Sequence, residues 1–250
     1  KPLERTWTYP GGDPVKVRVL FPPEYADNAP VVMKATLDSL TYFSDTLGRY
    51  PYRTVTAVIP PYNAGEAGGM EYPTFFTADT HFLHAGVIPA CRRPFSSIAE
   101  HDASLVEAWN ATVRPADTVY HVGDFALGPA EAAERIFRRL HGRKCLVAGN
   151  HDKRSRKLPW AEQHDGIREI SVEGRHLVLC HYPMRSWPRA FRGSLHLYGH
   201  VHGTLPGTTQ SCDVGVDVWS YRPVSLSNIV DAMALSDTVP EEVARARNRG

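Results

Sequence analysis

The sequence predicts an α/β domain that follows a smaller N-terminal α+β appendage, and three observations lead to this assignment. From residue 74 onward, short apolar runs of strand character alternate with amphipathic helical segments, which is the pattern of layered α/β domains. All 12 histidines lie at or after His81, whereas residues 1–73 are rich in Tyr, Pro and Gly. The 250 residues, of which 42% are hydrophobic and 22% charged, are enough for one large folded domain with an appendage.

The composition excludes several classes of partner. The 28 Lys and Arg residues nearly balance the 27 Asp and Glu residues, so the net charge of +1 offers no extended surface for nucleic acid or anionic lipid. No apolar run approaches the roughly 20 residues of a membrane-spanning helix, and the first residues lack the apolar core of a signal peptide. The four cysteines lie far apart, which excludes a disulfide scaffold or a Cys-based structural zinc site and favours a cytoplasmic protein.

The appendage is expected to contain a helix over residues 30–47, which ends before Gly48, and a strand over residues 54–59. The apolar residues that recur in this helix at three- and four-residue spacings are Met33, Leu37, Leu40, Phe43 and Leu47. Such a stripe must be buried against the strand of the appendage, against the following domain or in a second copy of the chain. A homodimer through the N-terminal segment is therefore one expectation.

The following domain is expected to contain strands, helices and one hairpin in alternation. The strands are expected over residues 74–78, 118–122, 144–148, 176–180 and 195–198. Ser97 and Glu100 form a capping box that opens a helix to about residue 113, and a second helix is expected over residues 129–140. A hairpin over residues 167–180 turns at Glu173 and Gly174, and a helix over residues 225–235 precedes a charged tail over residues 239–250.

Each of the five expected strands ends in residues that are typical metal ligands. In order along the chain these residues are Asp79, His81, Asp124, Asn150, His181, His200 and His202. The ligand site of an α/β layer lies beyond the carboxyl ends of its strands, so we expect these residues to meet at one place. Asp, Asn and His donors without Cys favour Mn, Fe or Zn, and seven donors are too many for one ion. Two divalent ions that share a carboxylate fit this set, and such a pair catalyses phosphoester hydrolysis.

The ordered motifs resemble those of the calcineurin-like metallophosphoesterases over about residues 74–235. This resemblance implies a sandwich of two sheets flanked by helices. It also implies a first metal ion at Asp79, His81 and His202, a second at Asn150, His181 and His200, and Asp124 as the bridging ligand. His151 is implied to stabilise the phosphoryl oxygens or to protonate the leaving oxygen, and Asp152 to orient and charge His151.

The implied activity is that of a dinuclear phosphatase or phosphodiesterase that uses a hydroxide bridging two transition-metal ions, with Mn favoured over Fe and Zn. His84, three residues after His81, and Arg93 are candidate contacts to the phosphoester substrate. The alternative is a non-catalytic binding module on the same fold, which the loss of metal ligands would indicate, but the ligand set is complete.

Other polar residues near these motifs are expected to be structural. His121, His176 and His196 lie among apolar neighbours and are interpreted as core or edge residues. Asp213 and Asp217 share one face of a run whose valines share the other, which is the pattern of a half-buried strand.

Residues 1–78 carry a second resemblance. The run from Tyr50 to Tyr52 and the segment that contains Gly69, Met70 and Glu71 are similar to the gluzincin aminopeptidases, in which the matching Glu binds the free amine of a peptide. The His-Glu-x-x-His helix that binds zinc in that family is missing from the sequence. We therefore expect residues 1–73 to be an incomplete, non-catalytic aminopeptidase-like fragment, residues 74–238 to be the phosphoesterase domain, and a peptidase-derived function to be the third alternative.

Overall fold

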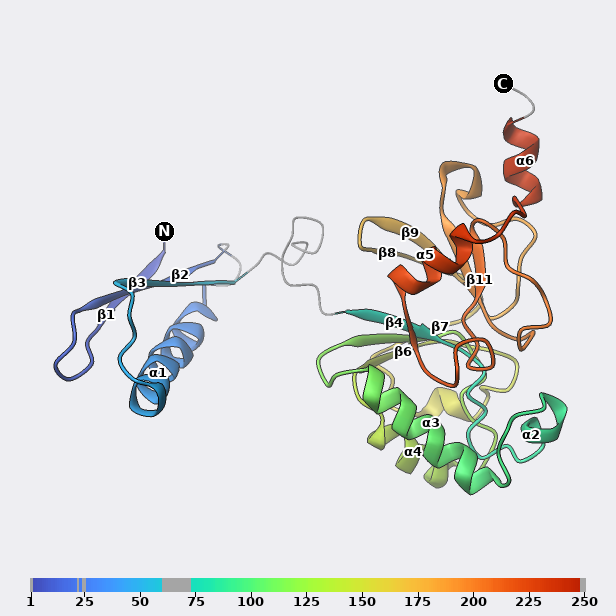
Figure 1. Ribbon diagram of the computed structural model, residues 1–250, viewed down its shortest axis with the longest axis horizontal. Coiled ribbons are helices and arrows are strands. Elements are labelled where there is room, and N and C mark those ends of the chain that lie inside the picture. The colour runs from blue at the N-terminus through green and yellow to red at the C-terminus, as the bar shows by residue number, and fades with distance from the viewer. Residues whose placement is uncertain (1, 22, 24–25, 60–72, 248–250) are drawn as a thin grey trace. The chain divides into compact units, whose positions relative to one another are not determined.

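The computed structural model describes residues 2–21, 23, 26–59 and 73–247 (Figure 1). The chain divides into two compact units, Lys1–Glu71 and Tyr72–Gly250. The part of the aminopeptidase-like motif that contains Gly69, Met70 and Glu71 lies outside the described residues. In the described ranges, no helix has both the length and the apolar character that crossing a membrane requires.

The first unit is a three-stranded sheet with one helix packed on it. Strands β1 (Leu3–Trp7) and β2 (Val15–Leu20) are antiparallel, and β2 pairs in parallel with β3 (Thr54–Val58). Helix α1 (Ala29–Leu47) connects β2 to β3, as a parallel connection requires. The observed helix and final strand confirm the elements expected from the sequence.

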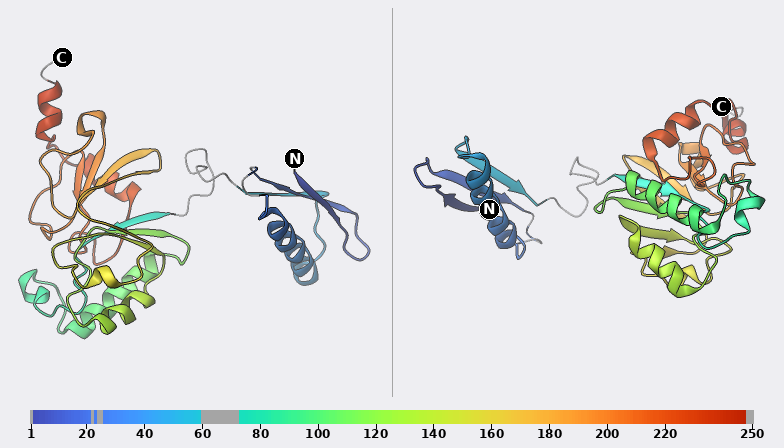
Figure 2. Two further views of the ribbon diagram at one scale, coloured as in Figure 1. Left: turned by 180° about the vertical axis from the view of Figure 1, so that it is seen from behind. Right: turned by 60° about the horizontal axis from the view of Figure 1, so that its bottom comes forward.

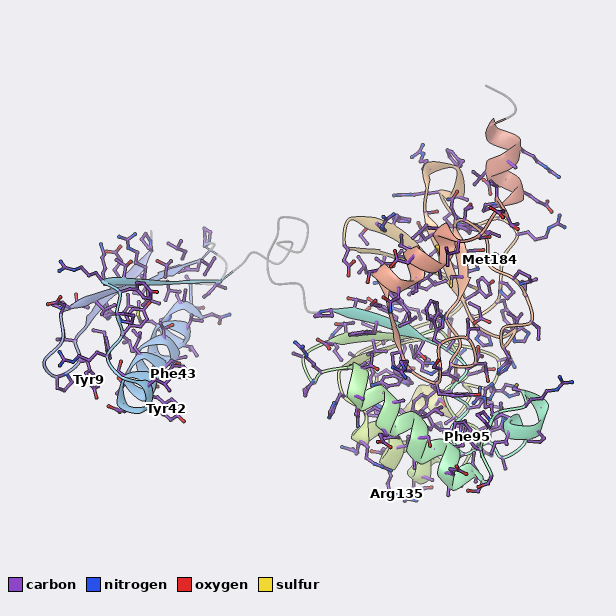
Figure 3. The ribbon with its side chains drawn as sticks, viewed as in Figure 1. Tyr9, Tyr42, Phe43, Phe95, Arg135 and Met184 are labelled. Carbon is purple, nitrogen blue, oxygen red and sulfur yellow. The ribbon has the colours of Figure 1, made fainter. Side chains whose placement is uncertain are left out.

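The buried face of α1 differs in part from the expected stripe. Met33 and Leu40 pack against the valines of β2, but Phe43 is 55% exposed and Leu47 is 80% exposed. Ser44 is buried instead, because a period of 3.6 residues continues from Leu40 to Ser44 and turns Phe43 away from the sheet. Tyr42 and Phe43 therefore form an exposed aromatic pair with ring centroids 5.5 Å apart (Figure 3). The expected homodimer through this segment stays a prediction.

The second unit contains a five-stranded sheet in the order β12-β4-β5-β6-β7. Its strands are β4 (Thr74–Thr77), β5 (Thr118–His121), β6 (Arg143–Val147), β7 (Glu162–His164) and β12 (Val224–Ser225). All neighbours are parallel except β12 and β4. Helices α3 (Ile98–Thr112) and α4 (Ala130–Arg139) cover one face of this sheet, and the short α2 (Val87–Ala90) lies in the loop that precedes α3 (Figures 1 and 2).

A four-stranded sheet in the order β11-β10-β9-β8 forms the other layer. Its strands are β8 (Arg168–Val172), β9 (Arg175–Leu179), β10 (Leu195–Tyr198) and β11 (Ser211–Asp213). Strands β8 and β9 form the expected hairpin, which turns at Glu173 and Gly174 with φ angles of 50° and 71°, as a two-residue turn requires. Strands β10 and β11 then continue the sheet in parallel with β9. Helices α5 (Leu226–Ala234) and α6 (Glu241–Arg247) complete the unit.

Two apolar clusters hold these layers together. The first joins the inner faces of the two sheets and includes Phe76, Val122, Leu179, Leu197 and Ile229 of α5. The second fills the space between the five-stranded sheet and α3 and α4, and it includes Leu105, Trp109, Phe125, Phe137 and Trp160. The fold is therefore the α/β arrangement of two sheets flanked by helices that the sequence predicts.

The ends of two helices can be compared with the sequence expectations. The Ser97 hydroxyl caps α3 by accepting a hydrogen bond from the Glu100 backbone N–H (3.2 Å), as expected. The Glu100 side chain completes the cap by accepting from Ser96 rather than from Ser97. Residues 241–247 were expected to lie in a charged tail but form α6 instead. Val243 of this helix packs in a cluster with Trp187 and Val178, and Glu241 forms an ion pair with Arg185 at 2.6 Å.

Candidate metal centre

Five strand ends place the candidate ligands. Asp79 and His81 follow β4, Asp124 follows β5, and Asn150 follows β6. His181 follows β9, and His200 and His202 follow β10. Because β4, β5 and β6 are parallel in one sheet and β9 and β10 are parallel in the other, each sheet delivers its ligands at one edge.

The backbone at this edge is strained at most of the ligands. Five of them have left-handed φ angles: Asp79 (54°), His81 (49°), Asp124 (61°), His200 (71°) and His202 (48°). Residues other than glycine rarely adopt this conformation, and such strain persists only where the surroundings fix it. Hydrogen bonds between the β4 and β5 loops do so here, since Asp79 N donates to Gly123 O (2.9 Å) and His81 N donates to Asp124 O (3.0 Å).

Two glycines are required because the ligands approach the backbone closely. A Cβ atom at Gly149 would lie 2.3 Å from Asp124 Oδ1, and one at Gly123 would lie 2.3 Å from His181 Nδ1. Gly123 also has a φ angle of 94°. A side chain at either position would displace Asp124 or His181.

The first set of ligands is Asp79, His81 and His202, whose donor atoms all lie within 4.8 Å of one another. Asp79 Oδ1 and His81 Nε2 are buried and have no hydrogen-bond partner among the residues that the structure describes. His202 Nδ1 lies 2.7 Å from Asp217 Oδ2. Since a carboxylate only accepts, Nδ1 carries the proton and Nε2 keeps the lone pair that a metal ion needs.

The second set is Asp124, His181 and His200, again with donor atoms within 4.8 Å of one another. Asn150 Oδ1 joins this set at 3.1 Å from His181 Nε2. His181 Nδ1 donates to the Val122 carbonyl (2.9 Å), so in this tautomer Nε2 carries the lone pair and faces the oxygens of Asn150 and Asp124. Asn150 and His200 are exposed, whereas Asp79 and His81 are buried, so the centre opens to solvent on the side of the second set.

Asp124 lies between the two sets. Its Oδ2 atom is 3.6 Å from His81 Nε2 and 3.4 Å from His181 Nε2, and its Oδ1 atom accepts a hydrogen bond from His151 N (2.9 Å). Although burial opposes ionisation, the neighbouring His181 and the His151 N–H hold the pKa of Asp124 below its ordinary value. One oxygen of a carboxylate anion thus faces both groups of donors.

The pKa shifts of His81 and Asp79, two members of the first set, suit a divalent cation. Burial lowers the pKa of His81, so this imidazole is neutral and can donate a lone pair. Burial also raises the pKa of Asp79 to about 7, because desolvation of the carboxylate outweighs the attraction of the nearby His202 and His181. A divalent ion would supply a compensating positive charge and would satisfy the unpartnered atoms of Asp79 and His81. The residues therefore fit two oxygen- and nitrogen-liganded divalent ions, and neither set contains a thiolate.

A third set, Cys91, His202 and Asp217, shares His202 with the first. Asp217 already accepts from both Arg93 and His202, and burial raises the pKa of the Cys91 thiol. The thiol is therefore protonated at neutral pH and is a poor metal ligand.

His151 lies at the edge of the centre, but Asp152 has a different position from the one expected. The His151 ring is half-buried, with its centroid 5.5 Å from that of His81. Asp152 is fully buried, and its carboxylate accepts from the backbone N–H groups of Asp124 (2.7 Å), Phe125 (2.9 Å) and Gly149 (2.8 Å). Asp152 therefore joins the loops after β5 and β6 instead of orienting the His151 ring.

Of the two candidate substrate contacts, His84 lies beside the centre as expected, whereas Arg93 does not face it. His84 is half-buried beside the first set, with its Nδ1 atom 3.2 Å from His81 Nδ1. Arg93 is only 4% exposed, and its guanidinium forms a bidentate pair with Asp217 (2.7 and 2.8 Å). Arg93 is thus bound inside the protein, which corrects its expected contact with substrate.

Asp217 is a site residue that the sequence reading missed. The expected strand ends at Asp213, and the chain then turns, with Val218 N donating to Gly215 O (3.0 Å). This turn brings the Asp217 carboxylate between Arg93 and His202, so alternation along a strand was the wrong pattern for residue 217. Asp213 has a structural role as expected, since it accepts from Gly203 N (2.8 Å) and Gly215 N (2.7 Å).

Tyr182 is a second residue that the sequence reading missed. Its exposed ring packs against the rings of His200 (4.7 Å between centroids) and His181 (5.1 Å). An aromatic residue directly after the ligand His181 was the available signal. The three histidines expected to be structural lie outside both sets: His121 and His196 are buried in the core, and His176 of β9 pairs with Glu169 of the edge strand β8.

Comparison with known proteins places this centre in a family context. Residues 75–218 match the model of the calcineurin-like phosphoesterase superfamily domain. An uncharacterized protein of Methanocaldococcus jannaschii is 34% identical over 165 residues, which are 62% of this chain and 88% of that protein. The gene 66 protein of Mycobacterium phage L5 is 28% identical over 63% of this chain and 92% of its own length.

A solved structure has the same fold. The crystal structure of a protein of unknown function from Aquifex aeolicus matches with a TM-score of 0.54 and 27% sequence identity, over 64% of this chain and 99% of that one. The family match lies inside the second unit. The aminopeptidase-like resemblance of residues 1–78 stays a prediction.

Proposed function

The chain belongs to the calcineurin-like phosphoesterase superfamily, and we propose that it hydrolyses phosphoesters with the help of two divalent metal ions. The position of Asp124 carries this proposal. One of its oxygens lies within 3.6 Å of His81 Nε2 and within 3.4 Å of His181 Nε2, so one carboxylate serves two separate groups of donors. A site for one ion would leave the donors of the second set, His181 and His200, without a ligand role.

In this proposal Asp79, His81, His202 and Asp124 hold the first ion, and Asn150, His181, His200 and Asp124 hold the second. Oxygen and imidazole donors without thiolate are compatible with Mn, Fe and Zn, and we propose Mn as the ion to test first. When bound, the two ions would activate water and offset the negative charge of the phosphoryl oxygens. The neutral amide of Asn150 limits the negative charge of the second set, which keeps the centre attractive to an anionic phosphoester.

The residues around these sets would handle the substrate. The opening lies at Asn150, His200 and Tyr182, which are exposed, so the phosphoester would enter on the side of the second set. The His151 backbone is fixed by its bond to Asp124 Oδ1, and its imidazole remains available to donate a proton to a phosphoryl or leaving oxygen. His84, with its ring 6.2 Å from that of His151, is the neighbouring candidate for a substrate contact.

Turnover of two chromogenic esters tests the proposal. The metal-stripped full chain would be reconstituted with Mn²⁺ and assayed with bis-p-nitrophenyl phosphate, a diester, and p-nitrophenyl phosphate, a monoester. We expect Mn-dependent hydrolysis of at least one ester, which Asp124→Asn abolishes and Asp231→Asn, on the exposed face of α5, leaves unchanged.

The same assay separates the non-catalytic alternative. Two bound ions without hydrolysis of either ester would favour a binding module over an enzyme. For residues 1–73 we propose a non-catalytic, aminopeptidase-like appendage, because every candidate ligand lies at Asp79 or later.

A further inference from the structure

Arg93 has every N–H group of its guanidinium paired in the interior of the protein. Nε donates to Asp217 Oδ1 (2.8 Å), and Nη2 donates to Asp217 Oδ2 (2.7 Å) and to the Asp79 carbonyl (2.7 Å). Nη1 donates to the Thr80 carbonyl (3.0 Å) and lies 2.8 Å from His101 Nε2. A guanidinium has five N–H donors, so this set of five acceptors uses all of them.

The His101 contact has a defined direction. His101 is fully buried on α3, and its Nδ1 atom lies 2.8 Å from Asp102 Oδ1. Since the carboxylate of Asp102 accepts, Nδ1 is the donor and Nε2 accepts from Arg93. The Phe95 ring packs edge-on against His101 at 5.2 Å, and its side chain lies close to α3 (Figure 3). Arg93 is therefore anchored to a helix of the scaffold.

The acceptors of Arg93 connect it to both parts of the first metal set, directly to the loop after β4 and through Asp217 to the loop after β10. The carbonyls of Asp79 and Thr80 lie in the loop after β4, where Asp79 has a φ angle of 54°. Asp217 in turn accepts from His202 Nδ1 at 2.7 Å, after β10. One side chain thus connects Asp79 directly, and His202 through Asp217, although these two ligands are 123 residues apart in sequence (202 − 79). Among the described residues, the side-chain hydrogen bonds of Arg93 include no member of the second set.

We propose that Arg93 is the positioning residue of the first metal set, which it assembles through the shape of its guanidinium rather than through its charge alone. The inference rests on the proposed two-metal function. Lys at this position would keep the positive charge but has three donors for five acceptors, so it would leave carbonyl or carboxylate oxygens unpaired. Loss of such outer partners typically weakens metal binding by about 10- to 100-fold. The effect should be confined to one of the two ions.

Metal binding by the full chain tests this inference without an activity assay. Metal-free wild type, Arg93→Met, Arg93→Lys and Arg92→Met would be titrated with Co²⁺ by calorimetry and visible absorption. Arg92 is exposed and adjacent, which makes Arg92→Met the matched control. We expect Arg92→Met to bind two ions, each with the affinity that the wild type has for it. We expect both Arg93 variants to keep one ion and to bind the other about 10- to 100-fold more weakly.

Proton NMR of the Co²⁺-loaded protein identifies the ion that is weakened. The Nδ1 protons of His202 and His181 are held by Asp217 and Val122, so each should give a shifted, exchangeable signal that marks its own set. With one equivalent of Co²⁺ per chain, the Arg93 variants should give the His181 signal without that of His202, because the weakened first set stays empty. The inference would be overturned if Arg93→Met bound both ions with the wild-type affinities, or if Arg93→Lys did so.

Two further outcomes are informative. If Arg93→Met lacks a cooperative thermal transition, Asp217→Asn takes its place, since it breaks the same connection to His202, and undiminished binding of both ions by Asp217→Asn would overturn the inference. A wild-type chain that binds only one ion would contradict the proposed function instead. The inference would then stand if that ion shifts the His202 signal and is weakened by Arg93→Lys, and would fail otherwise.

Discussion

Replacing Asp152 with Asn separates the role that the structure gives this residue from the role expected from the sequence. The Asp152 carboxylate is fully buried and accepts three backbone N–H groups, from Asp124, Phe125 and Gly149. The amide of Asn has one oxygen, so it can satisfy the two donors that Oδ2 now accepts, and its NH₂ group would face the Phe125 N–H. One buried donor would lose its partner, and the loops that carry Asp124 and Asn150 would separate.

The magnitude follows from these contacts. An unpaired buried N–H costs about 1–3 kcal/mol, and the two remaining bonds lose their charge assistance. Burial raises the pKa of Asp152, which means that the buried carboxylate is unfavourable in itself. Replacing it with a neutral amide therefore offsets part of the lost stability. We expect a net loss of about 2 kcal/mol in the free energy of unfolding, or roughly 4–8 °C in Tm for a domain of this size. Both proposed metal ions should also bind more weakly, because Asp124 is displaced.

The assay is urea unfolding of the metal-free protein, followed by circular dichroism, together with calorimetric metal titration. His151→Ala is the comparison, since its side chain is half-buried and at the edge of the centre. If Asp152→Asn kept wild-type stability and metal affinity but lost as much turnover as His151→Ala, Asp152 would orient His151 after all, and the reasoning from the backbone contacts would be refuted.

Three other perturbations have defined outcomes. His151→Ala should lower turnover about 10²- to 10⁴-fold while both ions stay bound, and loss of the ions would contradict its role as a proton donor. Burial lowers the pKa of His196 to about 4, whereas the pKa of His in an unfolded chain is about 6.5. Between these two values the unfolded chain binds a proton that the folded chain does not, so the free energy of unfolding decreases as the pH falls below about 6.5. Between about pH 6 and 4.5, His196→Gln should reduce the pH slope of the unfolding free energy by up to about 1.4 kcal/mol per pH unit, and an unchanged slope would show that His196 does not titrate in this way. A chain of residues 72–250 should bind two ions and match the turnover of the full chain, because the first unit has its own core and contains no candidate ligand; a folded fragment that binds both ions but is inactive would show that the first unit contributes to the site.

Much of the site could be predicted because its signals are local. The ligands follow five short strands that the sequence marks by their apolar residues, namely β4, β5, β6, β9 and β10. Parallel pairing of β4, β5 and β6 is then enough to bring Asp79, Asp124 and Asn150 together. The capping box at Ser97 and the turn at Glu173 and Gly174 are equally local.

The remaining features depend on contacts that no short window contains. Asp217 follows a strand with the right alternation for a structural residue, and only the turn after Gly215 directs it to Arg93 and His202. Arg93 resembles a solvent-exposed loop arginine in sequence, because its five acceptors come from three separate segments, which contain residues 79–80, 101 and 217. Asp152 follows His151 directly, which suggests a pair, yet its three donors come from two loops.

Electron paramagnetic resonance of the Mn²⁺-loaded chain, combined with its metal content, tests the shared carboxylate most directly. Two ions bridged by Asp124 would lie about 3.5–4 Å apart, close enough for their spins to couple. We predict two Mn²⁺ per chain with the spectrum of a coupled pair, and loss of that spectrum in Asp124→Asn. A single bound ion, or two ions that give only the six-line signal of isolated Mn²⁺, would contradict the account.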